Sequence, residues 1–428
     1  MVMLSSSRHG TVAGAGRPTA PSLRNAAVSR PRGALQVRAA AATDVGTSYD
    51  GVNQGPTCAT FTDHSGRQIQ PMCVDYGFRS GGGRLYQESY GETPGSVWSL
   101  AKDNFDKELL QLRQYTRYRV HPGPATVVPE GMLAKALNTV GESVASAFGR
   151  MDEALEKASL LPTLELAPKR GEFQSKEWTD VANQLSKLKL SNQAVAEMEH
   201  QRVLKEGDID TPFLVKAPFL ALCFVLDVLY DQKPIAKFWV LETVARIPYF
   251  AYISILHLYE SLGFWRAGAE LRKIHFAEEW NEMHHLQIME SLGGDQSWFD
   301  RFVAEHSAIA YYWLLIVFYL VSPKVAYNFM QRVELHAMDT YAEFIVANAE
   351  LLKTIPPPSV ALSYYLNEDL YLFDQFQSAN ATAPRRPECS NLYDVFVNIR
   401  DDELEHVKTM DACRTGTIAK AIAAKTPK

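Results

Sequence analysis

From Thr211 onward, the sequence consists of long apolar segments with helical periodicity, separated by short breaks. The breaks carry glycine and proline, including Gly263, the pair Gly293 and Gly294, and the proline run at 356–358. No internal repeat is evident at a period typical of solenoid proteins. The pattern predicts an all-α domain with six helices, at about 212–230, 235–262, 265–292, 298–321, 325–353 and 391–420.

Several acidic and imidazole side chains interrupt these apolar helices. A buried ionisable group is costly unless it pairs with an opposite charge or binds a metal ion. Few basic residues interrupt the same helices, so arginine or lysine partners for every glutamate are the less favoured interpretation. The sequence therefore indicates a site that binds cations.

The motif Glu-x-x-His places a carboxylate and an imidazole on one face of a helix, where both can bind one metal centre. It occurs three times in this chain. Glu197 and His200 lie among charged residues without an apolar stripe, which is typical of a solvated helix. The other two pairs lie on apolar faces and are favoured as ligands: Glu282 with His285, and Glu403 with His406.

A carboxylate-bridged pair of metal ions in a four-helix bundle needs one further glutamate from each of the two remaining helices. Glu242 and Glu334 both lie in apolar helical segments. Glu242 and Glu282 are equally distant in sequence from Leu262 at the break, so an antiparallel hairpin places both about 30 Å from the turn. The order Glu, Glu-x-x-His, Glu, Glu-x-x-His predicts a ferritin-like bundle with a dimetal site.

Four carboxylates and two imidazoles suit two iron or manganese ions better than zinc or copper. Neighbouring polar residues are assigned other roles. His284 and His336 point away from the ligand faces of their helices and are not expected to bind metal. Asn281 and Asp402 each precede a motif glutamate, and we expect them either to hydrogen-bond the ligands or to be ordinary polar helix positions.

Two apolar segments exceed what a water-soluble bundle requires. Residues 308–322 carry no charge, and residues 218–230 carry only Asp227. Both runs are shorter than the about 20 apolar residues of a membrane span, which favours helices lying in the membrane interface. Tyr311 and Trp313 suit the headgroup boundary. The sequence predicts a monotopic membrane protein, and the alternative is a fully buried core helix.

The first 43 residues contain six arginines and no acidic residue, a composition typical of an organelle transit peptide. A disordered basic tail is the alternative. Without this segment, 37 basic and 49 acidic residues remain, a net charge of −12. This balance argues against a nucleic-acid partner, because a duplex binder needs a basic face.

The region between the leader and the apolar helices contains about 80 residues rich in glycine, proline, serine and threonine, at 48–129, which we expect to be mostly loop. Apolar residues at steps of three and four then predict an amphipathic helix at 133–155 that docks on the core, on a partner or on a membrane, the core being favoured. A more polar helix is expected at about 176–203.

The predicted division of the chain is a transit peptide at 1–43, an N-terminal extension at 44–205, the helical domain with the dimetal site at 206–420 and a tail at 421–428. Five scattered cysteines without a C-x-x-C pair make a disulfide scaffold or zinc site unexpected. Cys58 and Cys73 are compatible with a regulatory disulfide, but two free thiols are the favoured interpretation.

The ligand segments resemble those of the alternative oxidase family, which are membrane-bound di-iron quinol oxidases. The similarity covers roughly 212–415. A segment at about 364–391, containing DLYLFDQFQ and RRPECSNLYDVF, is similar to the plastid terminal oxidase branch and is absent from mitochondrial relatives. The similarity is carried by LETVARIPYF, NEMHHL, VELHAMDTY and NIRDDELEHVKTM.

The resemblance implies that the same six residues bind two iron ions: Glu242, Glu282, His285, Glu334, Glu403 and His406. It places the family's redox tyrosine at Tyr341. It also places the quinol pocket at Lys237, Leu241 and Thr340. Lys237 stands where the family has arginine, so it keeps the positive charge but loses the planar donor fork.

The activity implied by the resemblance is oxidation of plastoquinol with reduction of dioxygen to water. The implied location is the stromal face of the chloroplast thylakoid membrane, where the enzyme relieves an over-reduced quinone pool and supports carotenoid desaturation. The expected partners are plastoquinol, dioxygen, the membrane surface and a second copy of the chain. Two alternatives remain: a di-iron desaturase or hydroxylase, and a non-catalytic ferritin-like iron-binding protein.

Overall fold

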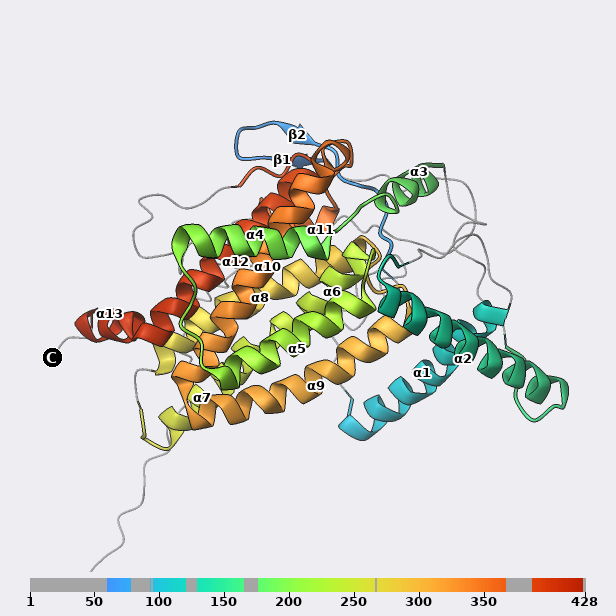
Figure 1. Ribbon diagram of the computed structural model, residues 1–428, viewed down its shortest axis with the longest axis horizontal. Coiled ribbons are helices and arrows are strands. Elements are labelled where there is room, and N and C mark those ends of the chain that lie inside the picture. The colour runs from blue at the N-terminus through green and yellow to red at the C-terminus, as the bar shows by residue number, and fades with distance from the viewer. Residues whose placement is uncertain are drawn as a thin grey trace, which may run out of the picture. The chain divides into compact units, whose positions relative to one another are not determined.

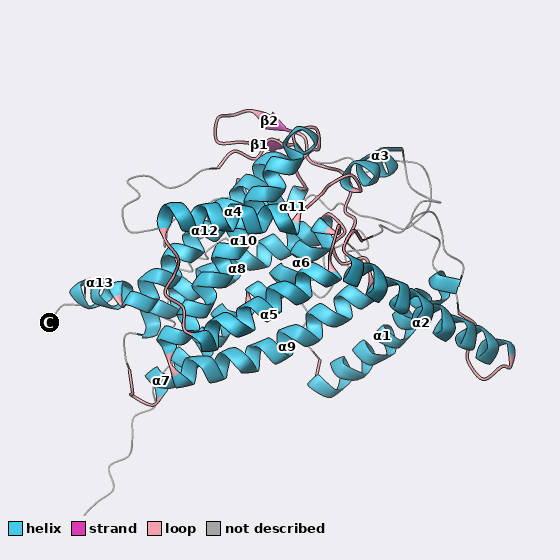
Figure 2. Ribbon diagram, viewed as in Figure 1, coloured by secondary structure: helices cyan, strands magenta, loops and turns pink. Residues whose placement is uncertain are grey.

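The computed structural model describes residues 60–77, 93, 95–120, 129–164, 176–265, 268–366 and 387–425. The predicted transit peptide, Cys58 and most of the predicted plastid-type insert lie outside these residues. In the described part of the chain, the only strands are β1 (Phe61–Thr62) and β2 (Gln68–Ile69), which pair antiparallel. Helices make up nearly all the rest, as Figure 2 shows, so the all-α prediction is confirmed.

The centre of the domain is a four-helix bundle (Figure 1). Its first member is a pair of short consecutive helices, α6 (Pro234–Ala245) and α7 (Ile247–Ser261). The others are α8 (Gly268–Ser291), α10 (Pro323–Leu352) and α12 (Leu392–Thr415). Further helices surround this bundle: α4 (Asn192–Glu206), α5 (Phe213–Leu229), α9 (Trp298–Val321) and α11 (Ser359–Tyr365).

Three predicted helices are interrupted. The helix expected at 235–262 breaks at Arg246, because Pro248 has no N–H to donate to the preceding turn. The helix expected at 391–420 stops at Thr415, where Gly416 takes a left-handed conformation before α13 (Thr417–Lys425). The α13 helix therefore replaces part of the expected tail. The polar helix expected at 176–203 is divided into α3 (Lys176–Leu185) and α4.

The N-terminal extension contains a helix that the sequence analysis assigned to loop. Helix α1 (Val97–Val120) packs against α2 (Met132–Lys157), at the right of Figure 1. Charged contacts hold the pair together: Arg113 and Arg117 both bind Asp152, at 2.6 and 2.9 Å. Apolar residues at helical spacing, such as Phe105, Leu109 and Leu112, were present in α1, but they were not used in the prediction.

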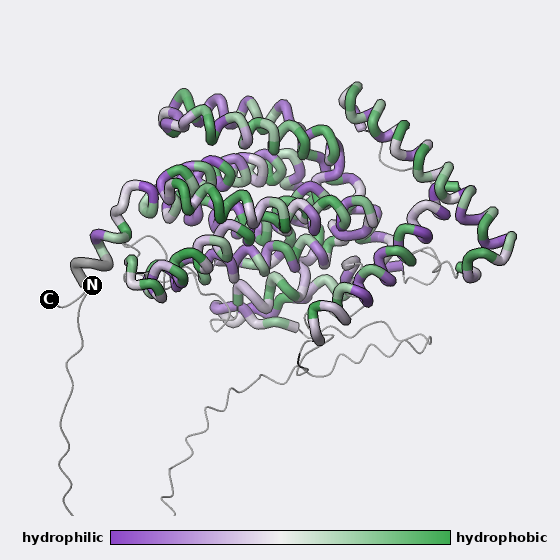
Figure 3. Tube along the Cα trace, turned by 90° about the horizontal axis from the view of Figure 1, so that it is seen from below, coloured by the Kyte–Doolittle hydropathy of each residue, from purple (hydrophilic) through white to green (hydrophobic). Residues whose placement is uncertain are grey.

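Helix α2 does not bury its apolar stripe. Leu133, Val140 and Phe148 are 50, 60 and 54% exposed, while the neighbouring face carries Asp152 onto α1. Core docking through the stripe was the favoured interpretation, and it is wrong. Figure 3 shows hydrophobic segments along peripheral helices as well as in the interior.

Helices α5 and α9 are also only partly covered. By length and composition, α9 is the one helix among the described residues that could cross a membrane, and 17% of its most apolar window is buried. Phe224 on α5 and Trp313 on α9 are 58 and 63% exposed. The alternative that α9 is a fully buried core helix is therefore excluded.

The cysteines differ from expectation at one position. Cys73 is disulfide-bonded, so the prediction of a free thiol there is wrong. Cys58 lies outside the described residues. Among the described cysteines, Cys389 is buried and free, and Cys223 and Cys413 are half-buried and free.

Two apolar clusters form the core, and each of the four bundle members contributes to both, the first through α6 to one cluster and through α7 to the other. Along α10, Met330 belongs to one cluster and Phe344 to the other. Along α12, the corresponding residues are Met410 and Ile399. The segment between the two clusters on each helix is where the predicted ligands lie. The core thus has a polar layer enclosed by two apolar layers.

The tight contact of Gly294 with α6 gives the first prediction. A Cβ on Gly294 would collide with Trp239 and come within 2.8 Å of the Ile235 carbonyl oxygen. We therefore expect Gly294→Ala to lower the free energy of unfolding by roughly 1–3 kcal/mol. Gly141→Ala is the control, since a Cβ there meets nothing within 4 Å and should stabilise α2 by about 0.5–1 kcal/mol. Denaturant titration measures both, and equal stability of the two variants would contradict the packing argument.

Candidate metal centre

Four helices bring the six predicted ligands into one buried layer. Each side chain is at most 2% exposed. The depth argument from the α6–α8 hairpin holds, because Glu242 and Glu282 lie side by side. The contributions are Glu242 from α6, Glu282 and His285 from α8, Glu334 from α10, and Glu403 and His406 from α12.

The six side chains form two overlapping groups. In each group, one atom from every member lies within 4.8 Å of the others. Glu282 and Glu403 belong to both groups. The first group adds Glu242 and His285, and the second adds Glu334 and His406. This is the arrangement expected of two neighbouring metal sites that share two carboxylates.

The imidazoles lie between the carboxylates. His285 Nδ1 is 3.2 Å from a Glu403 oxygen and 3.8 Å from a Glu242 oxygen. His406 Nδ1 is 2.8 Å from a Glu282 oxygen. Each imidazole therefore contacts glutamates from other helices, so the ligand layer links all four members of the bundle.

Burial and mutual repulsion disturb the acid–base properties of this layer. Burial, followed by the charges of Glu282 and Glu403, raises the pKa of Glu242 well above its ordinary value. The pKa of Glu334 is raised well above its ordinary value for the same reasons. Burial alone would lower the pKa of His285, but its carboxylate neighbours raise it to about 10. The layer thus retains protons in order to neutralise its own negative charge.

Several ligand atoms form no hydrogen bond of acceptable geometry among the described residues, even where an imidazole nitrogen lies close to a carboxylate oxygen. These are Glu242 Oε2, both carboxylate oxygens of Glu282, and His285 Nδ1. Buried polar atoms are nearly always satisfied, so such a concentration at one point needs an explanation. Cations bound between these atoms would satisfy them and replace the retained protons. The donor set therefore fits a pair of metal ions.

Two tyrosines close the layer in a crossed arrangement. The Tyr341 hydroxyl on α10 donates to Glu242, and the Tyr249 hydroxyl on α7 donates to Glu334 at 2.6 Å. Burial, followed by the nearby carboxylate charges, raises the pKa of both phenols well above the ordinary value. Tyr341 also stacks on Phe238, with ring centroids 4.2 Å apart.

Tyr249 was missed by the sequence analysis, although a signal was present. Tyr341 follows Glu334 by seven residues, and Tyr249 follows Glu242 by the same interval. Seven residues are close to two helical turns, so each tyrosine lies near the face of its glutamate. The helix break at Arg246 does not remove Tyr249 from the site.

Asp402 connects the ligand layer to surrounding polar groups. Its Oδ2 is 3.2 Å from His285 Nε2, and it accepts hydrogen bonds from Tyr365 at 2.9 Å and Asn281 at 3.0 Å. Asn281 also donates to the Tyr364 hydroxyl at 2.8 Å. Of the two interpretations of Asn281 and Asp402, the structure therefore supports contact with the ligands. Asp402 orients His285 so that Nδ1 faces the carboxylates.

The histidines that were not expected to bind metal lie elsewhere. His284 Nδ1 donates to the Trp280 carbonyl at 2.7 Å, and its ring stacks on Tyr364. His336 Nδ1 lies 2.5 Å from a Glu199 oxygen on α4. Glu197 and His200, the remaining Glu-x-x-His pair, are exposed on α4.

The predicted quinol-pocket residues are only partly brought together. Leu241 lines a narrow cavity of about 30 Å³ that reaches Glu242 and Tyr341. Lys237 is not in its lining: its ammonium is buried and binds Asp227 at 2.7 Å. Thr340 also lies outside the lining, and its hydroxyl donates to the His336 carbonyl.

Part of the chain is similar to a known protein family. A family model described as "Alternative oxidase" matches residues 216–415, which include the whole ligand layer. Residues 216–415 therefore resemble an alternative oxidase domain, and this name is used below for that segment. The resemblance inferred from the ligand segments is therefore confirmed.

Individual relatives of the alternative oxidase domain come from plants. A chloroplastic/chromoplastic ubiquinol oxidase 4 of Arabidopsis thaliana is 56% identical over 191 residues, which are 45% of this chain and 54% of the relative. The mitochondrial alternative oxidase 3 of Glycine max is 27% identical over 195 residues, 45% of this chain and 53% of the relative. The chain thus spans about half the length of the curated relatives it matches.

The Asp402 contacts of the alternative oxidase domain predict a measurable effect. Asp402→Ala leaves buried donors of Tyr365 and Asn281 without their acceptor, which should lower the free energy of unfolding by on the order of 3 kcal/mol. It should also weaken metal binding roughly 10–100-fold. Asp401→Ala is the control, because Asp401 pairs only with half-exposed Arg400. Unfolding and metal titrations measure both effects, and a stable Asp402→Ala variant with normal metal affinity would contradict the assignment.

The His336–Glu199 pair predicts a pH dependence in the metal-free protein. Burial lowers the pKa of His336, but contacts with Cys223 and Glu199 outweigh it and raise the pKa to about 10, from 6.5. A pKa raised by folding stabilises the fold fully below the unfolded value and ceases to do so as pH rises through the folded value.

We therefore expect Glu199→Gln to lower the free energy of unfolding below about pH 6.5, with a diminishing effect toward about pH 10. Denaturant unfolding across this range measures the change, with exposed Glu206→Gln as the control. An effect of Glu199→Gln that stayed constant with pH would exclude the proposed pairing.

Proposed function

We propose that the alternative oxidase domain couples oxidation of two plastoquinol molecules to reduction of one dioxygen to two waters, with two iron ions as cofactor. The observation that carries this proposal is the pair of overlapping Glu/His groups in the buried layer. The family match and the names of the relatives, which include a chloroplastic ubiquinol oxidase, support it. Four electrons and four protons pass from the two quinols to dioxygen, so the reaction balances.

The six ligand residues are assigned to the two iron ions as follows. In the proposed arrangement, Glu242 and His285 hold one ion, Glu334 and His406 hold the other, and both ions share Glu282 and Glu403. The ions, when bound, supply the redox chemistry with dioxygen. Anionic oxygen ligands favour the ferric state, which suits a site that must give electrons to dioxygen.

Tyr341 is the proposed catalytic tyrosine. Its hydroxyl contacts Glu242 and it lines the narrow cavity, so it lies between the ligand layer and any molecule in that cavity. Its raised pKa keeps the hydroxyl protonated. Tyr341 can therefore present a proton or a hydrogen atom at the boundary of the metal centre.

The narrow cavity is the proposed approach for the quinol. Apolar side chains of α5 and α10 line it, and it ends at Glu242, Glu334 and Glu403. Tyr311 of α9 also lines it, so the cavity lies close to both helices proposed to contact lipid. Leu241 belongs to this approach, whereas Lys237 and Thr340 are assigned supporting positions behind it. A quinol must widen the cavity in order to enter.

Membrane attachment is proposed through α5 and α9. Their exposed apolar residues form the surface that would enter the interface as a monotopic anchor. The proposed location is the stromal face of the thylakoid membrane, and the proposed assembly is a homo-oligomer. The exposed residues include Phe213, Leu220 and Phe224 on α5, and Ile309, Trp313, Val317 and Leu320 on α9.

Removal of one shared ligand tests the proposed centre. Glu403→Ala takes a carboxylate from both groups, so iron content should fall from two per chain toward zero, and quinol-dependent oxygen uptake should cease. The bundle should stay folded, because the change also removes a repelling buried charge. Glu197→Ala is the matched control, since it alters the exposed Glu-x-x-His pair. Normal iron content and oxygen uptake in Glu403→Ala would reject the site.

Oxygen uptake with different substrates distinguishes the quinol oxidase from the desaturase or hydroxylase and from the non-catalytic iron-binding protein. Iron-loaded protein given a reduced plastoquinone analogue should consume oxygen in proportion to quinol oxidised. Iron-loaded protein that consumed oxygen only with an acyl or other apolar substrate would instead be a desaturase or hydroxylase. Iron binding without turnover on any of these substrates would indicate the non-catalytic alternative.

A further inference from the structure

A second, much larger cavity lies away from the ligand layer, beneath the α1–α2 hairpin. Its volume is about 470 Å³, within the range of sites for small organic molecules. Helices α1 and α2 form one side, and the end of α5 and the start of α9 form the other. None of the six predicted ligands lines it. The proposed quinol oxidase activity therefore gives it no role.

The hairpin is held at three separate points around this cavity. Asp231, in the α5–α6 connection, accepts hydrogen bonds from the backbone N–H groups of Glu130 and Gly131 at 2.7 and 2.8 Å, which caps α2. Arg301 of α9 donates to Gln111 of α1 at 3.0 Å. The Tyr115 and Trp298 rings are 6.0 Å apart. The space between these attachments is not filled by side chains.

The wall on the α2 side is the apolar stripe that the helix fails to bury. Leu137, Val144 and Phe148 line the cavity and are still 47, 49 and 54% exposed. Leu229 of α5 and Phe299 of α9 line the opposite side. The cavity is therefore open along one edge, and its lining continues onto the exposed apolar face of α2. An aliphatic chain of a lipid fits such a surface.

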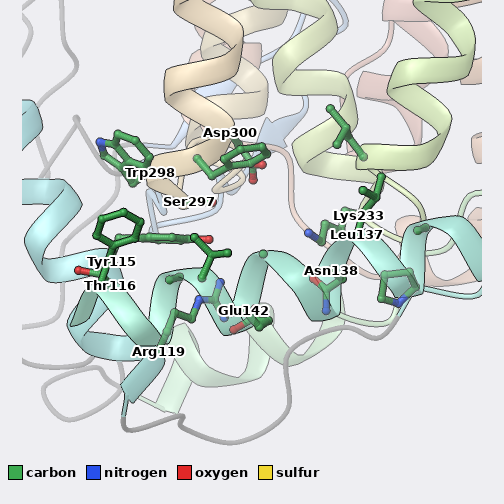
Figure 4. Close-up of a pocket in the computed structure, with 18 of the residues that line it drawn as sticks. Tyr115, Thr116, Arg119, Leu137, Asn138, Glu142, Lys233, Ser297, Trp298 and Asp300 are labelled. Atoms are coloured by element: carbon green, nitrogen blue, oxygen red, sulfur yellow. Dashed lines mark ion pairs between the residues drawn. The ribbon is translucent and has the colours of Figure 1, made fainter. Parts of the chain in front are cut away.

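Four charged side chains line the cavity, Arg119 and Glu142 on the hairpin side and Lys233 and Asp300 on the opposite side, as Figure 4 shows. Arg119 binds Glu142 at 2.9 Å, so these two charges neutralise each other. Lys233 extends from the N-terminus of α6 and makes no ion pair with any described carboxylate. Asp300 is buried, and burial raises its pKa, while the charge of Lys233 opposes that shift. The ammonium of Lys233 thus acts on Asp300 only at a distance, and among the described residues it has no direct ion-pair partner.

We propose that this cavity binds a long-chain carboxylic acid, with the aliphatic chain along the α2 stripe and the carboxylate at Lys233. A single negative charge matches the single available ammonium. A doubly charged phosphate head would bring a second negative charge close to Asp300, which disfavours it relative to a carboxylate. The site is a binding site separate from the metal centre, and it does not depend on the proposed oxidase function.

Gly141 allows a direct test. It lines the cavity in the middle of α2, and a Cβ there meets nothing within 4 Å. Gly141→Phe should place a ring in the cavity without disturbing the hairpin. Gly141→Ala is the matched control, because it makes the same backbone change and leaves nearly all the space. Val144→Trp, at another lining position, is a second blocking variant.

The experiment uses full-length, iron-loaded protein, delipidated in neutral detergent, with radiolabelled palmitate in equilibrium dialysis. Wild type and Gly141→Ala should bind one palmitate per chain. Gly141→Phe and Val144→Trp should bind at least tenfold more weakly, with unchanged iron content and helicity. Absence of saturable binding by wild type, or undiminished binding by both blocking variants, would overturn the proposal.

The head group is tested separately. Lys233→Gln should weaken palmitate binding at least tenfold and leave binding of methyl palmitate unchanged. Equal affinity of wild type for the acid and its methyl ester would refute the role of Lys233. Tighter binding of a single-chain phosphate lipid than of palmitate would refute the choice of a carboxylate.

Discussion

Repulsion among four buried carboxylates is the constraint on which the rest of this structure depends. Glu242, Glu282, Glu334 and Glu403 cannot all be ionised at such short separations without positive charge between them. The protein surrounds them with two histidines and two tyrosines and places an apolar cluster at each end of the layer. Water is thus excluded from a centre whose negative charge must be neutralised by retained protons or by bound cations.

The crossed tyrosines extend this coupling from the ligands to the helices. Tyr341 reaches from α10 to the glutamate of α6, while Tyr249 reaches from α7 to the glutamate of α10. Each phenol therefore fixes the carboxylate of a different helix from its own. The proline-induced break between α6 and α7 lets Glu242 and Tyr249 come from consecutive short helices and still face the same layer.

Most ligands of the centre could be predicted, because the patterns that mark them lie within one helix or one hairpin. The Glu-x-x-His spacing and the equal distances of Glu242 and Glu282 from the turn both follow from helix geometry. The break at Arg246 was missed because apolar periodicity continues through Pro248. The pairing of α1 with α2 was not predictable, because the ion pairs from Arg113 and Arg117 reach Asp152, which is distant in sequence. The position of Lys237 was not predictable either, since its partners Asp227 and Asn192 belong to other helices.

The α1–α2 hairpin reverses the usual distribution of polarity, with ionic contacts inside and hydrocarbon outside. The ion pairs of Asp152 hold the two helices together, whereas the exposed apolar side chains of α2 interact with apolar surroundings. Recoding outward-facing positions such as Val140 with hydrophilic residues would leave Asp152 and its arginines in place. The solubility of this hairpin in aqueous buffer can therefore be changed without changing the fold.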